Sequence, residues 1–202
     1  MTARRSNRLS RQTSTRDLLP RVLVVCEGNT EKELLCTLRG YYRIPSLSVK
    51  VLGQVGVPKT IVDKAKETAA DFDEAWVVFD RDDHPGWDEA IRSGQDQGMG
   101  LAVSNPCVEL WGLLLHQAQT AHIDRKNAQT ALSKVHPKYH HEKHPYFDRQ
   151  SVLEHSARAH QRAEHLVKSR TENADPFGNP STRLHYLVAR LSKLGRIIDG
   201  EK

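Results

Sequence analysis

The apolar residues of the chain predict strands and helices that alternate as far as residue 117. Four short apolar runs are typical of buried strands, and they lie at 21–26, 47–53, 75–80 and 100–106. The segments between and after these runs have the pattern of helices, at 31–42, 59–72, 87–98 and 107–116. We therefore expect an α/β fold with a mainly parallel four-stranded sheet flanked by helices.

The pattern changes after residue 117, where it becomes helical and strongly polar. Helices are expected at 149–170 and 183–194, and the last one repeats apolar residues at helical spacing, which is typical of a core or a partner interface. These apolar residues are Leu184, Leu187, Val188 and Leu191. Residues 1–20 hold five arginines and have almost nothing to bury, so we expect a flexible basic arm. The expected organisation is an arm at 1–20, an α/β domain at 21–117 and a mostly helical C-terminal extension at 118–202.

Two of the expected helices begin next to residues that can cap them. Thr30 can cap the first helix, with Glu33 three residues later as its capping-box partner. Ser181 or Thr182 can cap the final helix. Such caps satisfy backbone N–H groups that have no partner within the helix.

The composition indicates a basic protein with an ordinary core. The chain has 202 residues, of which 38% are hydrophobic and 27% charged, and a net charge of +5. It contains no apolar run of the length that a membrane span requires, no apolar segment behind the basic N-terminus, and three cysteines without a CxxC pair. We therefore expect a cytoplasmic protein that does not enter a membrane. Basic proteins often bind phosphate-rich partners, although many basic enzymes never contact nucleic acid.

Acidic residues follow two of the expected strands. Glu27 ends the first strand, and Gly28 after it lets the chain turn closely beside a ligand. The third strand runs into Asp80, Asp82 and Asp83. Functional groups collect at the carboxyl ends of parallel strands, and a divalent cation can hold repelling carboxylates together. The acids are therefore candidate ligands for Mg²⁺, although such an acidic turn is also typical of a solvated loop.

Longer segments around these acids resemble a known family. VVCEGNTEKELL followed by WVVFDRDDH resembles the Toprim domain of topoisomerases, bacterial primases and OLD-family nucleases. With SNPCVELWGLLLH and the later NPST added, the chain resembles the RloB family, also known as the AbiLii abortive-infection proteins, which are commonly found beside an ATPase partner. The resemblance covers roughly residues 21–195, and it implies that 21–117 is a Toprim-like catalytic domain.

The resemblance also implies roles for individual residues. Glu27 matches the glutamate that acts as general acid/base or metal ligand, and Asp80 and Asp82 match the aspartates that bind Mg²⁺, with Mn²⁺ as an alternative. Thr30 and Glu31 match a TE pair inside the mouth of the same site. The expected catalytic residues are Glu27, Asp80 and Asp82. The expected metal ligands are Glu27, Asp80, Asp82, Asp83 and Glu109.

The function that these expectations support is nucleic acid hydrolysis. We expect a Mg²⁺-dependent nuclease that cleaves phosphodiester bonds in DNA or RNA, tRNA included, with activated water and as an antiphage effector. A non-catalytic nucleic-acid-binding or regulatory subunit of an ATPase-containing defence complex is the alternative. A phosphoryl-transfer enzyme acting on a nucleotide is a third. A homo-oligomer is compatible with the sequence, which leaves the oligomeric state open.

Basic and histidine-rich segments are candidates for contacts with nucleic acid. The residues expected to contact the phosphate backbone are Lys59, Arg81, Arg149, Arg158 and Arg162. Charges along helices are, however, more often solvent faces. The stretch 136–147 holds His136, His140, His141 and His144. It is compatible with a zinc site, with a basic and aromatic binding surface (Lys138, Tyr139, Lys143, Tyr146 and Phe147), or with a solvated loop.

Overall fold

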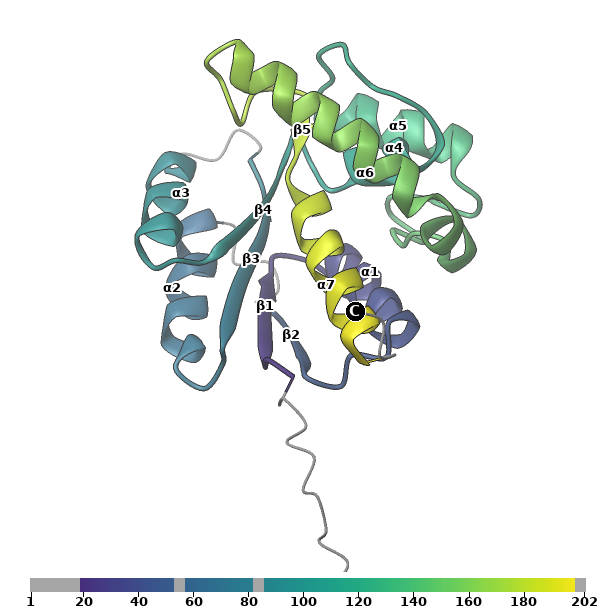
Figure 1. Ribbon diagram of the computed structural model, residues 1–202. Coiled ribbons are helices and arrows are strands. Elements are labelled where there is room, and N and C mark those ends of the chain that lie inside the picture. The colour runs from purple at the N-terminus through teal and green to yellow at the C-terminus, as the bar shows by residue number, and fades with distance from the viewer. Residues whose placement is uncertain (1–18, 53–56, 82–85, 199–202) are drawn as a thin grey trace, which may run out of the picture.

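The sheet has the expected parallel character and one additional strand. The computed structural model describes residues 19–52, 57–81 and 86–198. Its strands lie in the order β2-β1-β3-β4-β5 (Figure 1). They are β1 (Val22–Cys26), β2 (Leu47–Val51), β3 (Glu74–Asp80), β4 (Gly100–Asn105) and β5 (Ser181–Thr182). The first four are parallel and β5 pairs antiparallel with β4, so the predicted α/β fold is confirmed.

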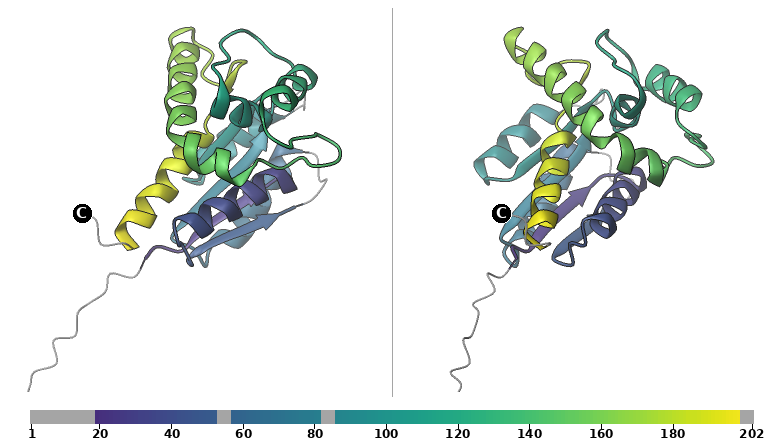
Figure 2. Two further views of the ribbon diagram at one scale, coloured as in Figure 1. Left: turned by 90° about the vertical axis from the view of Figure 1, so that its right-hand side faces the viewer. Right: turned by 45° about the vertical axis from the view of Figure 1, so that its right-hand side comes forward.

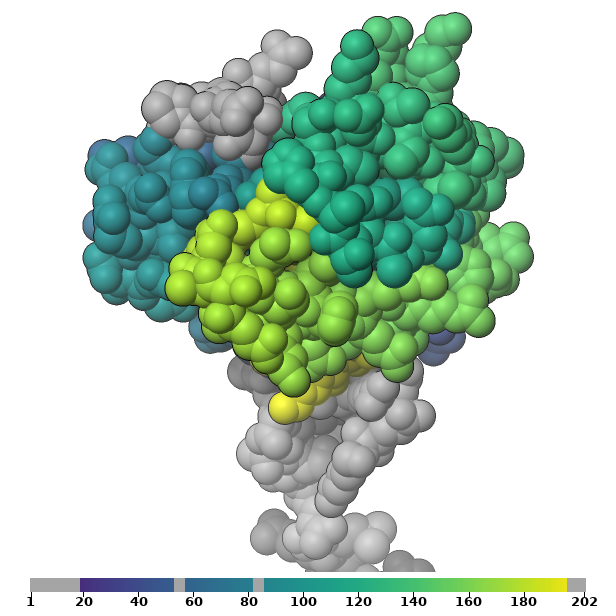
Figure 3. Space-filling model, turned by 90° about the horizontal axis from the view of Figure 1, so that it is seen from above, coloured from purple at the N-terminus to yellow at the C-terminus, as the bar shows by residue number. Residues whose placement is uncertain are grey.

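The helices cover both faces of this sheet and its carboxyl edge. They are α1 (Asn29–Tyr41), α2 (Pro58–Ala69), α3 (Trp87–Asp96), α4 (Glu109–His116), α5 (Arg125–Val135), α6 (Arg149–Glu172) and α7 (Leu184–Ile198). Helices α2 and α3 cover one face, and α1 and α7 lie together over the other (Figure 2). Seen from the carboxyl edge, residues 109–172 lie beside α3 (Figure 3). We call this segment, which contains α4, α5 and α6, the helical cap.

Strand β1 is apolar throughout because both of its faces are buried. Val22, Val24 and Cys26 belong to the hydrophobic cluster on the side of α1 and α7. Leu23 and Val25 belong to the cluster on the side of α2 and α3. Alternate residues of a strand point to opposite faces, so a central parallel strand has no polar side. This burial fixes the position of the residues that follow β1.

Helix α4 is apolar on all sides because it packs between α5 and α6. Its buried side chains include Leu110, Trp111 and Leu114, which join the cluster that contains β1. A helix buried on all sides has no need of a polar face. Within the described residues, no helix is long and apolar enough to cross a membrane.

The chain returns from the helical cap to the sheet through β5 and α7. Leu184, Leu187 and Leu191 of α7 are fully buried in the cluster that also contains β1. The predicted apolar face of the final helix is therefore part of the core. Arg190 adds a charged contact, since its Nε donates to Glu74 Oε2 at 2.9 Å and its Nη2 also reaches that carboxylate. The α/β layers and the C-terminal helix thus share one core.

The predicted cap of the first helix is wrong, whereas Thr182 does accept a hydrogen bond from the first residue of the last helix. Helix α1 begins at Asn29 after Gly28, and no side chain caps its first turn. Thr182 lies in β5, where its hydroxyl hydrogen-bonds with Ser104 Oγ at 2.8 Å. The backbone N–H of Leu184 also donates to this hydroxyl, at 3.3 Å. Pairing with the edge of β4 therefore determines the conformation of this segment.

The histidine-rich stretch is anchored in the helical cap. The backbone N–H of Asp148 donates to His136 Nε2 at 2.6 Å, so the other ring nitrogen of His136 carries the proton and donates to His116 Nε2 at 2.6 Å. Burial lowers the pKa of His136 to about 4, which keeps this ring neutral. Tyr139 and Phe147 are buried, so the expectation that they belong to an exposed binding surface is wrong. Lys138 and Lys143 are exposed, as are His140, His141 and His144.

The shared core predicts that α7 unfolds together with the sheet. Leu187→Ala should reduce the free energy of unfolding by about 2–5 kcal/mol, because it leaves a cavity between α7 and the sheet. Lys193→Ala on the exposed side of the same helix is the matched control and should change it by less than about 0.5 kcal/mol. Urea titrations followed by circular dichroism and by tryptophan fluorescence measure both. Two separate transitions in either signal would show that α7 is not part of the same folding unit.

Candidate active site

Four carboxylates meet at the carboxyl edge of the sheet. Glu27 directly follows β1, Glu31 lies in the first turn of α1, Asp80 ends β3, and Glu109 begins α4. The side chains of Glu31, Asp80 and Glu109 are buried, and Glu27 is partly exposed. Each of the other three acids raises the pKa of Asp80, which shows how close the charges lie. We call these four residues the acidic cluster.

The register of the sheet brings Glu27 against the end of β3. Cys26 pairs with Val78, and the backbone N–H of Glu27 donates to Val78 O at 3.2 Å. The backbone N–H of Asp80 in turn donates to Glu27 Oε2, at 3.4 Å. Two residues distant in sequence thus become neighbours because parallel strands end at the same edge. The expectation that Glu27 and Asp80 share a site is met in the geometry.

Glu31 owes its position to the glycine before α1. A Cβ atom on Gly28 would lie only 2.8 Å from Glu31 Oε2, so a larger residue would displace this carboxylate. The group that approaches Gly28 closely is therefore the Glu31 carboxylate of the protein itself, where the sequence predicted a ligand. Burial, together with the charges of Glu27 and Glu109, raises the pKa of Glu31 to about 7 against the opposing effects of a backbone hydrogen bond and of Arg125. Glu31 is accordingly a full member of the cluster.

Asp80 is in direct contact with a basic residue of the helical cap. Arg125 Nη2 donates to Asp80 Oδ2 at 3.0 Å. Burial and then the charge of Glu31 raise the pKa of Asp80, whereas Arg125 lowers it. The net shift is upward, so one guanidinium does not offset burial among three other acids.

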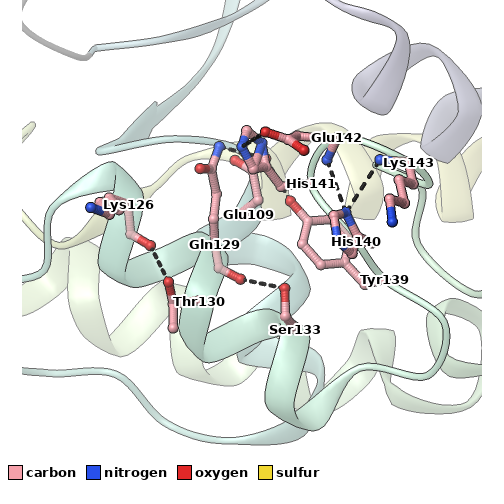
Figure 4. A network of polar contacts seen from close by, with 10 residues as sticks. All are labelled: Glu109, Lys126, Gln129, Thr130, Ser133, Tyr139, His140, His141, Glu142 and Lys143. Carbon is pink, nitrogen blue, oxygen red and sulfur yellow. Dashed lines mark hydrogen bonds and ion pairs between the residues drawn. The ribbon is translucent and has the colours of Figure 1, made fainter.

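Glu109 is held by the helical cap. Tyr139 Oη donates to Glu109 Oε1 at 2.8 Å, and Gln129 Nε2 donates to the same oxygen at 3.4 Å (Figure 4). Burial and the charge of Glu109 raise the pKa of Tyr139, so its phenol stays protonated and donates. The cap therefore sets the orientation of one carboxylate of the cluster.

The side chain of Asn179 shows how the NPST segment supports the site. Its Nδ2 donates to Asn105 Oδ1 at 3.2 Å and to Ile123 O at 2.8 Å, while its Oδ1 accepts from the Ile123 backbone N–H at 2.9 Å. Asn105 ends β4, and Ile123 lies two residues before Arg125. This side chain thus ties the end of the sheet to the start of α5.

Arg81, predicted to contact nucleic acid, has structural partners in this structure. Its Nη1 donates to Phe177 O at 2.7 Å and lies 3.6 Å from Asp175 Oδ1. Its guanidinium also stacks on Trp87, 3.8 Å from the ring centroid. Arg81 therefore connects the end of β3 to α3 and to the turn before β5.

The other predicted nucleic-acid contacts do not form one surface. Arg149 and Arg158 are exposed on α6, but nine residues of helix place them on opposite sides. Arg162 is partly buried and donates to Leu114 O at 2.6 Å, in the last turn of α4. Lys59 is exposed and forms an ion pair with Glu89 at 2.5 Å. A single phosphate-binding face along α6 is therefore not present.

The donor chemistry of the acidic cluster fits a hard divalent cation. Carboxylate oxygens are the ligands that Mg²⁺ and Mn²⁺ prefer, and Glu31, Asp80 and Glu109 are buried at one edge of the sheet. Among residues 19–52, 57–81 and 86–198, however, no three acid, histidine or cysteine side chains converge closely enough to hold an ion. Asp82 and Asp83, two of the predicted ligands, lie outside the described residues.

Sequence reasoning did not identify Arg125, Gln129 or Tyr139 as site residues. All three come from the helical cap, at least 44 residues beyond Arg81 in the chain, and only folding brings them to the acids. One feature of the sequence could have drawn attention to Arg125. It is the first residue of a helix, where a positive charge is unfavourable because it opposes the helix dipole. A cation placed there needs another source of stabilisation.

Burial of Glu31 predicts that neutralising it stabilises the metal-free protein. In EDTA at pH 8, Glu31→Gln should raise the free energy of unfolding by about 1–3 kcal/mol, because an ionised carboxylate no longer has to be buried among others. The folded-state pKa of Glu31 is raised, so its cost is complete above pH 7 and disappears below its ordinary value of 4.5. The gain should therefore shrink between pH 8 and pH 4.5.

Denaturant titrations across this pH range measure the effect. Glu33→Gln is the matched control, since Glu33 is exposed on the same helix, and it should leave stability nearly unchanged at every pH. A loss of stability in Glu31→Gln at pH 8 would contradict the arrangement described above.

The residues of this site all lie within a segment that matches a known protein family. A family model described as RloB-like protein matches residues 22–191, from the first residue of β1 into α7. The match includes all four residues of the acidic cluster and the cap residues that hold them. No curated protein and no solved structure matches the chain. Because the matched segment makes up most of its length, the chain belongs to the RloB-like family.

Proposed function

We propose that this protein is a divalent-metal-dependent nuclease that hydrolyses nucleic acid phosphodiester bonds in the cytoplasm as an antiphage effector. The observation that carries the proposal is that Glu27, Glu31, Asp80 and Glu109 lie at the same carboxyl edge of the sheet, three of them buried. Membership of the RloB-like family is consistent with a role in defence. The Toprim character of the site and its dependence on Mg²⁺, or on Mn²⁺, are parts of the proposal.

The four acids differ in what they can do. A bound divalent cation would polarise a phosphate oxygen and lower the pKa of a water molecule. Asp80 and Glu109 are buried and held by hydrogen bonds, so they are suited to bind such a cation in a fixed position. Glu27 is the more accessible acid, which suits it to accept the proton of an attacking water. Asp82 and Asp83 follow Asp80 directly and are proposed as further ligands.

The surroundings of the cluster are compatible with a polyanionic substrate. The chain carries a net charge of +5, and Lys138 and Lys143 are exposed in the loop whose Tyr139 contacts Glu109. Phosphate contacts of this kind do not distinguish DNA from RNA, so both, tRNA included, are proposed substrates. An ATPase partner that controls the activity is part of the proposal.

One observation favours the alternative of a non-catalytic nucleic-acid-binding or regulatory subunit of an ATPase-containing defence complex. Arg125 already pairs with Asp80, and no described set of three ligands converges on one point. A binding module that retained the fold would tolerate such an arrangement. It would have less reason to bury Glu31 among three other acids, because burial of this kind costs stability.

Cleavage assays separate the two functions. Purified protein is incubated with DNA, total RNA and tRNA, with Mg²⁺ or Mn²⁺ and with EDTA. We expect cleavage that requires the metal and falls about 100-fold or more in Glu27→Gln and in Asp80→Asn, because each removes a group that acts on water or metal. Glu33→Gln should cleave like the unaltered protein.

Cleavage that persists in EDTA, or that both site variants retain, would overturn the proposed mechanism. If the protein cuts none of the substrates but binds them with the same affinity in Asp80→Asn, the binding-module alternative is favoured instead. Measuring cell toxicity of the same variants, with and without a candidate ATPase partner, extends the comparison to a setting in which a partner can act.

A further inference from the structure

Arg125 is a basic residue of the helical cap that directly contacts the acidic cluster. Its Nη2 atom lies 3.0 Å from Asp80 Oδ2. Its charge lowers the pKa not only of Asp80 but also of Glu31, so the guanidinium acts on more than one acid. The guanidinium therefore places a positive charge at the edge of the acidic cluster, beside Asp80.

The start of α5 positions Arg125 without stabilising its charge. Asp124 is the N-cap of α5 and accepts a hydrogen bond from the Asn127 backbone N–H at 2.8 Å. Ala128, one turn further on, is buried in the hydrophobic cluster that also contains Leu113. As the first residue of α5, Arg125 lies at the positive end of the helix dipole. The acidic cluster, and not the helix, is what favours a positive charge at this point.

The Arg125 side chain also borders solvent, unlike the side chain of Asp80. Its side chain is 38% exposed, whereas that of Asp80 is 8% exposed. A long side chain that borders solvent can change its rotamer without opening the core. Asp80, at the end of a buried strand, cannot move away from the sheet in the same manner.

We propose that Arg125 is an internal counter-ion of the acidic cluster, which pairs with Asp80 in the metal-free protein and leaves it when a divalent cation binds. The inference rests on the metal site of the proposed function. It explains why a guanidinium lies 3.0 Å from Asp80 at the edge of a group of four carboxylates. Once displaced, the guanidinium remains at the edge of the site, where its planar donor groups suit a phosphate.

Removing a counter-ion and removing a residue with a purely structural role would change metal affinity in opposite directions. A group that stabilises only the metal-free state competes with the metal, so its removal tightens metal binding. An arginine that merely positions Asp80 would act in the other direction, and its removal would weaken binding. Metal affinity therefore distinguishes the two roles without any measurement of catalysis.

Calorimetric titration of the metal-free protein with MnCl₂ provides the test. We expect Arg125→Gln to bind Mn²⁺ at least about fivefold more tightly than the unaltered protein, the lower range of typical coupling between sites. Lys126→Gln, which removes the same charge from the exposed neighbouring residue, should change the affinity less than about twofold. In EDTA, Arg125→Gln should also melt at a lower temperature, because the acids lose a counter-ion.

Arg125→Lys provides a second readout should the glutamine variant not fold. It keeps the charge but loses the planar fork, so its Mn²⁺ affinity should lie above that of the unaltered protein and below that of Arg125→Gln. Binding that is unchanged or weaker in Arg125→Gln, or in Arg125→Lys when only this variant folds, would overturn the counter-ion role while leaving the metal site in place. Absence of Mn²⁺ binding in every variant would overturn both.

Discussion

The concentration of negative charge at the carboxyl edge of the sheet is the constraint on which the rest of the site depends. Burial and mutual repulsion raise the pKa of both Glu31 and Asp80, so the cluster works against the stability of the fold. A buried ion pair such as Asp80 with Arg125 does not by itself recover that cost. The fold tolerates the cluster because two hydrophobic layers hold the strand ends in place. Perturbed acids that a fold retains in this manner are typical of functional sites.

The helical cap belongs to the site as much as the sheet does. Glu109 begins α4, Tyr139 orients its carboxylate, and Arg125 at the start of α5 pairs with Asp80. Asn179 ties the loop before α5 to the end of β4, and α7 then returns to the sheet within the core that also contains β1. A displacement of the cap would therefore change the charge and geometry of the acidic cluster.

Much of the fold follows from patterns that are local in sequence, and so do the positions of Glu27 and Asp80 in the site. The runs before Glu27 and Asp80 are apolar because their strands are buried on both faces, and parallel strands bring their last residues together. Strand β5 could not be predicted from the sequence, because a strand of two residues has no hydrophobic periodicity. It forms because Thr182 pairs with Ser104, a residue far away in the sequence. Arg125 and Tyr139 also escaped prediction: their role depends on where α4 places the cap, and nothing near them in sequence points to the acids. The division of the chain at residue 117 stays a prediction.

The central claim is that the acidic cluster is a binding site for a divalent cation, with Arg125 in place of that cation when the site is metal-free. Crystals of the protein grown with MnCl₂ test it most directly, since manganese is identified by its anomalous scattering. The account predicts an anomalous peak bounded by Glu27, Asp80 and Glu109, with Arg125 turned away from Asp80. Crystals with full manganese at other sites, no peak at the cluster and the Arg125–Asp80 pair intact would contradict it.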